Sequence, residues 1–101
     1  MGRQNPTVII ALGGNAISPK NEAGTINQQF EHTRHSLKGV MSFVKKRYNI
    51  CITHGNGPQV GLLSLQSAAY TDVKEYPLDV LGAQTEGMIG YMIEQELGPA
   101  L

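Results

Sequence analysis

VIIALGGNAIS, residues 8–18, is an apolar run that stops at two glycines and an asparagine. Residues 7–12 are expected to form a strand, and apolar side chains on both of its faces are typical of a parallel strand covered by helices on two sides. Gly13 and Gly14 have no Cβ, so the backbone N–H groups there can approach a ligand closely. The stretch therefore predicts a buried strand that ends in a loop suited to a small anion.

A second strand with the same kind of ending follows further along the chain. Residues 50–53 are apolar apart from the last, and the sequence continues as THGNGPQVG at residues 53–61. Between the two strands, an apolar stripe of helical period predicts one long helix from an N-cap at Thr25 to about residue 47. The stripe consists of Ile26, Phe30, Leu37, Val40, Met41 and Val44. Strand, helix and strand in this order predict a right-handed βαβ unit with parallel strands.

Two more helices are expected, over about residues 58–70 and residues 78–97, joined by a polar connection. The first has Pro58 in its opening turn, where a missing N–H costs nothing. The pattern predicts an α/β fold, specifically the N-terminal part of a three-layer α/β/α sandwich. Two strands rarely make a stable sheet, and no closing strand follows. We therefore expect residues 1–101 to be the beginning of a longer domain.

Both strands end in glycine-rich loops, which we call the first glycine loop (residues 13–15) and the second glycine loop (residues 55–57). In open α/β sheets, ligands bind outside the carboxyl ends of the strands. The helix beginning near Pro58 adds the positive end of its dipole. The alternative for either loop alone is a tight turn, with Asn15 and Asn56 capping it locally. The candidate site residues are Gly13, Gly14, Asn15, Gly55, Asn56 and Gly57.

A dinucleotide site is a competing interpretation of the second glycine loop, because residues 55–61 match G-x-G-x-x-x-G. That fingerprint requires a following strand with an acidic residue at its end, roughly 20 positions on. Residues 72–77 are instead a polar connection, and no Walker-type phosphate loop is present. The sequence therefore disfavours a dinucleotide site.

Charge and composition exclude several other classes. Eight basic and eight acidic side chains give a net charge of zero, which argues against nucleic-acid partners and anionic membrane surfaces. Cys51 lies in the second predicted strand, and we expect a buried structural thiol. His32 and His35 lack companion ligands, so no metal site is predicted, and His54 is expected to be a hydrogen-bonded structural group. Without an apolar signal core in the first residues, a cytoplasmic location is expected.

Three segments together resemble a known family. ALGGNA at residues 11–16, THGNGPQVG at residues 53–61 and GAQTEGMIGYMI at residues 82–93 are similar to the signature segments of carbamate kinases. Those enzymes have the amino-acid kinase fold, which also includes acetylglutamate and aspartate kinases. The resemblance extends from residue 8 to residue 97. It implies that residues 1–101 are the N-terminal portion of one carbamate kinase-like domain.

The resemblance implies reversible phosphoryl transfer between carbamoyl phosphate and ADP, giving ATP and carbamate, with Mg²⁺. It also implies a role in arginine metabolism and a homodimer. The first glycine loop would face the transferring phosphoryl group as the catalytic loop, and the second would hold the carbamate end of the substrate. The nucleotide site is expected beyond Leu101.

Ala11 is the point where the resemblance to some relatives fails. In acetylglutamate kinase a lysine stands two residues before the glycine pair, whereas carbamate kinases resemble this chain in lacking it. We therefore expect residues 1–101 alone to be inactive. The alternative from another class is a non-catalytic module that binds a small anion or regulates a partner.

The helix predicted over residues 78–97 has a stripe of small residues, Ala83, Gly87 and Gly90, at four- and three-residue spacing. Such a stripe permits close approach of another helix. That helix could belong to the same fold or to a second subunit, and the resemblance to homodimeric enzymes favours the subunit interface.

Overall fold

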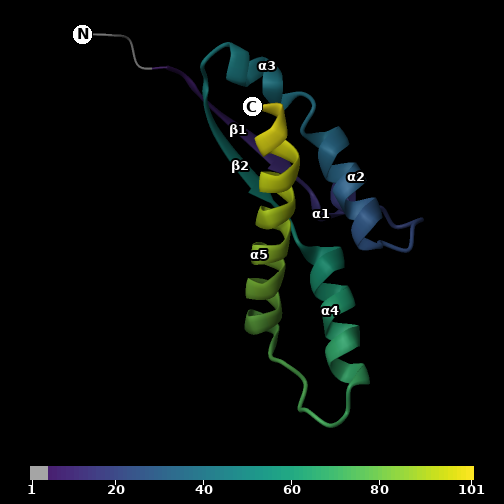
Figure 1. The fold of residues 1–101 in the computed structure, drawn as a ribbon. Coiled ribbons are helices and arrows are strands. Elements are labelled where there is room, and N and C mark those ends of the chain that lie inside the picture. Colours follow the sequence, from purple (N-terminus) through teal and green to yellow (C-terminus); the bar gives the residue numbers. More distant parts are fainter. Residues whose placement is uncertain (1–4) are drawn as a thin grey trace.

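The computed structural model describes residues 5–101 and contains a two-stranded parallel sheet with helices packed against it (Figure 1). Strand β1 (Thr7–Leu12) pairs with β2 (Asn49–His54) along the full length of both. The register places Thr7 opposite Asn49 and Leu12 opposite His54, so both strands end at the same level. The predicted α/β class and the parallel strand pair are confirmed.

The segment between the strands differs from the sequence prediction. It contains three helices, α1 (Gly14–Ile17), α2 (Ile26–Ser36) and α3 (Val40–Lys45). The prediction of one helix to residue 47 was wrong, because the chain turns at residues 37–39. Gly39 is a poor helix former, and the turn buries Leu37 and Val40 together against Leu12. Helix α1 was missed, since residues 13–24 were expected to be a loop.

Helix α2 begins as the sequence predicted. The Thr25 hydroxyl accepts from the Gln28 N–H at 3.2 Å, and the Gln28 side chain accepts from the Thr25 N–H at 3.0 Å. This reciprocal pair is a capping box and satisfies two otherwise free N–H groups at the helix start. Gly24, just before it, has φ +75°, a conformation that favours glycine.

Helices α4 (Gly57–Ala69) and α5 (Leu78–Leu97) form an antiparallel hairpin. The tip of this hairpin projects away from the sheet, whereas the C-terminal half of α5 lies beside the strands (Figure 1). Both helices lie within one residue of the predicted bounds. A short 3-10 helix, η1 (Gly98–Ala100), follows α5. No helix within residues 5–101 combines the length and the apolar character needed to cross a membrane.

One face of the sheet packs against the helices and the other face is exposed. Leu12, Leu37 and Val40 form a buried cluster on the covered face. Partly buried side chains pack around it: Ile10, Val44, Ile50, Ile52, Ile93 and Leu97. On the opposite face Ile9 is 69% exposed, and Cys51 is exposed too, so the prediction of a buried thiol was wrong. Residues 5–101 thus supply a helical layer on one face of the expected sandwich.

A second buried cluster joins the end of α1 to α5. Ile17, Ile89 and Met92 are fully buried there, with Phe30 of α2 packed against them. The ring of Phe30 also meets the ring of Tyr91 edge to face, at 6.5 Å between centroids. This cluster fixes the segment that follows the first glycine loop.

An ion pair on the outside links α2 to α5. The Arg34 Nε donates to Glu96 Oε2 at 2.9 Å, and Nη2 lies 3.4 Å from Oε1. This hydrogen bond lowers the pKa of the Glu96 carboxyl below its ordinary value near 4.5. A carboxyl whose pKa is lower in the folded state stabilises the fold above its unfolded-state pKa. That stabilisation is lost as the pH falls through the folded-state pKa.

We predict that Glu96→Gln lowers the melting temperature slightly at pH 7, because surface pairs are weak. The difference from the wild type should shrink as the pH falls below about 4.5 and vanish once Glu96 is protonated. Thermal melts of the complete protein between pH 7 and pH 3 measure this. Glu94→Gln is the control, because Glu94 is exposed and forms no ion pair within residues 5–101. A difference of the same size at pH 7 and at pH 3 would contradict the prediction.

Candidate anion-binding site

The two glycine loops lie against each other at the carboxyl ends of the strands. The Gly55 N–H donates to the Leu12 carbonyl at 2.8 Å, which extends the strand pairing by one bond. A Cβ added to Gly55 would lie 3.1 Å from the backbone nitrogen of Gly14. The structure thus brings together the loops that the sequence singled out.

Gly14 allows this close approach. It is buried, and a Cβ there would lie 2.7 Å from Pro58 Cδ and 3.3 Å from the Gly57 nitrogen. No side chain fits such a contact without displacing the start of α4. Gly13 differs: its φ is −69°, and nothing lies within 4 Å of an added Cβ. The two adjacent glycines therefore have different roles, close packing for Gly14 and an open surface for Gly13.

The loops present backbone donors. The N–H groups of Gly14, Asn15 and Gly57 have no backbone acceptor within residues 5–101, as is usual for the first turn of a helix. The dipole of α4 adds partial positive charge at its start. Such an arrangement suits negatively charged oxygens.

Asn56 does not have the local capping role that the tight-turn alternative gave it. Its Nδ2 donates to Thr85 Oγ1 of α5 at 2.9 Å, so this amide group faces α5 and does not cap its own loop. Asn15 is exposed beside the first glycine loop. Sequence analysis missed Thr85, although a threonine within the apolar segment at residues 82–93 is the kind of buried polar residue that needs a partner.

Two buried glutamines behind the loops were also missed. Gln59 is 2% exposed and Gln29 is 4% exposed. Gln59 Nε2 donates to Gln29 Oε1 at 3.3 Å, and Gln29 Nε2 donates to the Gly24 carbonyl at 2.9 Å. Gln59 Oε1 is buried without a hydrogen-bond partner within the described part of the chain. The two amides tie the start of α4 to α2 and to the turn at Gly24.

The histidines take no part in a metal site in the described part of the chain. His32 Nε2 lies 2.7 Å from Glu22 Oε2, and His54 Nδ1 lies 3.2 Å from the carbonyl of its neighbour Gly55. Residues 5–101 contain no group of three or more His, Cys, Asp or Glu side chains placed to hold an ion.

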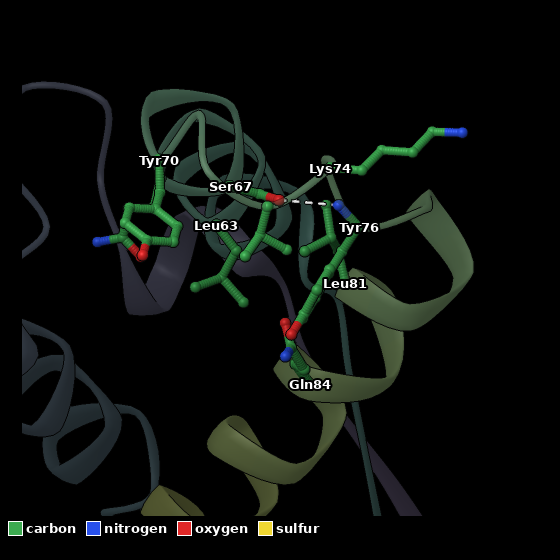
Figure 2. A pocket seen from close by; sticks show the side chains of 9 residues that line it. Leu63, Ser67, Tyr70, Lys74, Tyr76, Leu81 and Gln84 are labelled. Carbon is green, nitrogen blue, oxygen red and sulfur yellow. Dashed lines mark hydrogen bonds between the residues drawn. The ribbon is translucent and has the colours of Figure 1, made fainter.

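A separate cavity of about 330 Å³ lies between α4 and α5 near the tip of the hairpin (Figure 2). Ser67 Oγ accepts from the Tyr76 N–H at 2.8 Å at its edge. The lining is mainly apolar and includes Leu63, Tyr70, Val73, Tyr76 and Leu81. No glycine-loop residue lines this cavity, so it is distinct from the candidate anion site.

The chain is similar in sequence and in structure to carbamate kinases. It is 55% identical over 91 residues to the carbamate kinase of Haemophilus influenzae and 51% identical over 94 residues to that of Rhizobium meliloti. These matches cover 90% and 93% of this chain. The structure of carbamate kinase from Giardia lamblia bound to AMP-PNP matches 95% of the chain, with a TM-score of 0.87 and 39% identity. No family model matches the chain.

The chain spans 29% of the length of the two bacterial relatives and 34% of the Giardia chain. Over the matched residues, the α/β fold of this chain is that of the corresponding part of the Giardia carbamate kinase structure. This chain is homologous to an N-terminal portion of the carbamate kinases.

We predict that Gly14→Ala destabilises the complete protein by about 1–3 kcal/mol, the usual cost of overpacking. The reason is the 2.7 Å contact with Pro58, and Gly14→Val is expected to disturb the fold further. Gly13→Ala is the matched control, and its effect should stay within about 0.5 kcal/mol. Denaturant unfolding of both variants measures the difference, and equal effects would contradict the assigned roles.

Proposed function

We propose that these residues are the N-terminal portion of a carbamate kinase-like phosphotransferase. The reaction is reversible transfer of a phosphoryl group between carbamoyl phosphate and ADP, giving ATP and carbamate. The supporting observation is the contact between the two glycine loops at the ends of parallel strands, in a chain 55% identical to a carbamate kinase. The reaction and the substrates are proposals for the complete protein.

In this proposal the first glycine loop, Gly13, Gly14 and Asn15, faces the transferring phosphoryl group. The second, Gly55, Asn56 and Gly57, holds the carbamate end of the substrate. Phosphoryl transfer needs positioning and stabilisation of the negative charge spread over the phosphoryl oxygens. Backbone N–H groups already fixed by the packing of Gly14 against Pro58 supply both. Removing one donor of this kind costs on the order of 3 kcal/mol of transition-state stabilisation.

ATP or ADP is the proposed co-substrate, supported by the AMP-PNP in the Giardia carbamate kinase structure. We place the nucleotide site beyond Leu101. When bound, Mg²⁺ would neutralise charge on the phosphate oxygens. The described residues do not fit a metal site of their own, because they hold no cluster of acidic or histidine ligands. Their part in the reaction is the binding and orientation of the phosphoryl group and its acceptor.

A non-catalytic small-anion-binding or regulatory module is the second candidate. It is supported by the backbone N–H donors of the glycine loops, which lie in the described part of the chain, where no cluster of metal ligands is present. Ala11 does not separate the two candidates, because carbamate kinases resemble this chain in lacking a lysine there. Such a module would retain the backbone donors and bind an anion without turnover.

The two candidates predict different results for the protein expressed from its complete reading frame. A phosphotransferase forms ATP from carbamoyl phosphate and ADP, measured by coupled luminescence. Gly13→Val should then lower kcat about 100-fold without changing the melting temperature. The added side chain has room in the fold, but in this proposal it takes up the open space where the phosphoryl group would lie against the donors. Residues 1–101 alone should form no ATP above the uncatalysed rate. Binding of carbamoyl phosphate without any turnover by the complete protein would favour the module.

We also propose a homodimer in the cytoplasm, with α5 at or near the interface and no nucleic-acid or membrane partner. The support is the stripe of small residues, where Gly87 is exposed and an added Cβ on Gly87 or Gly90 would meet nothing within 4 Å.

Gly87→Glu should therefore leave the subunit folded and weaken the dimer, because a charge would be buried between subunits. Light scattering of the complete protein measures its mass. Gly61→Glu is the matched control, since Gly61 is exposed on α4 and has equal room for a side chain. An unchanged dimer in Gly87→Glu would place the interface elsewhere.

A further inference from the structure

Thr85 is a fully buried polar residue on α5, with 0% exposure. Its hydroxyl donates to the Gly82 carbonyl of the same helix at 2.7 Å. A threonine hydroxyl has one hydrogen, so its oxygen is left as an acceptor. Asn56 Nδ2 donates to that oxygen at 2.9 Å. The direction of both hydrogen bonds is thus fixed, from Asn56 to Thr85 and from Thr85 to its own helix.

Asn56 occupies the N-cap position of α4 and makes no side-chain cap. Asparagine is among the preferred N-cap residues because its side-chain oxygen accepts from the second or third N–H of the helix. Here the second position is Pro58, which has no N–H. The Gln59 N–H is therefore the group that an Asn56 cap would take.

With its Nδ2 bonded to Thr85, the Asn56 side chain makes no cap on its own helix. The Gln59 N–H consequently has no hydrogen-bond acceptor within residues 5–101 as long as the Asn56 amide is bonded to α5. Together with the Gly57 N–H, this group forms the donor set at the start of α4. A side-chain cap on α4 would compete with a bound anion for that donor.

We propose that Thr85 is a positioning residue that holds Asn56 away from its own helix and keeps the first-turn N–H groups of α4 available to the substrate. The inference rests on the proposed function for the identity of that substrate, a carbamate or phosphoryl oxyanion. Thr85 itself touches no substrate, and it acts through Asn56.

Thr85→Val and Thr85→Ser separate this role from packing. Valine has nearly the same shape but cannot accept from Asn56, whereas serine keeps the hydroxyl. In the complete protein, Thr85→Val should raise KM for carbamoyl phosphate about 10-fold and leave KM for ADP unchanged. Thr85→Ser should stay within about twofold of the wild type, since the accepting oxygen remains. Equal losses in the two variants would overturn the proposal.

A double-mutant cycle tests whether Thr85 acts through Asn56. Asn56→Gly removes the side chain that we expect to cap α4 once Thr85 is replaced by valine. Glycine is tolerated at an N-cap position. In that background Thr85→Val should have no further effect on KM. Full additivity of the two substitutions would mean that Thr85 acts by another route. Thr85→Ala, which also lacks the hydroxyl, replaces Thr85→Val if the valine variant does not fold.

Amide hydrogen exchange gives a readout independent of turnover. The Gln59 N–H should exchange fast in the wild type and in Thr85→Ser, and should become protected when inorganic phosphate is added. In Thr85→Val it should be protected without phosphate, because Asn56 then caps it. The same exchange rate in all three proteins would overturn the positioning role. Absence of ATP formation by the wild type would instead refute the proposed function, and the exchange experiment would still decide the role of Thr85.

Discussion

The contact between Gly14 and Pro58 is the constraint on which the rest of the site depends. The two strands end at the same level, so their loops must leave the sheet side by side. The loops can lie in contact because Gly14 has no Cβ; a Cβ there would lie only 2.7 Å from Pro58 Cδ. This close approach brings the first turns of α1 and α4 together. The backbone nitrogens at the starts of α1 and α4 therefore lie close to one another.

Hydrogen bonds between polar side chains of α2, α4 and α5 hold the start of α4 in place. Gln59 and Gln29 join the start of α4 to α2, and Thr85 joins Asn56 to α5. The Gln59–Gln29 bond is buried and the Asn56–Thr85 bond is partly buried. A buried polar group that loses its partner is left unsatisfied, at a cost of about 1–3 kcal/mol. Rigid support of this kind is what preorganised donors require, because stabilisation of developing charge depends on dipoles that do not have to reorient.

The sequence predicted the strands, the capped start of α2 and both glycine loops, because each depends on local signals such as apolar runs, Thr25 and adjacent glycines. It did not predict the break at Gly39, where burial of Leu37 and Val40 overrides the helical period. The orientation of Asn56 was also beyond it, since its partner Thr85 lies 29 positions away. Sequence patterns specify elements well, whereas side-chain partners between elements depend on packing in three dimensions.

The exposed face of the sheet has a consequence for chemical labelling. Cys51 is the chain's only cysteine, and it lies on that face, as does the largely exposed Ile9. A thiol in this place is open to alkylating reagents unless other polypeptide covers the sheet. The rate at which a maleimide modifies Cys51 therefore reports whether the second face of the sheet is covered. The modification occurs at a single natural cysteine, so no engineered probe is needed.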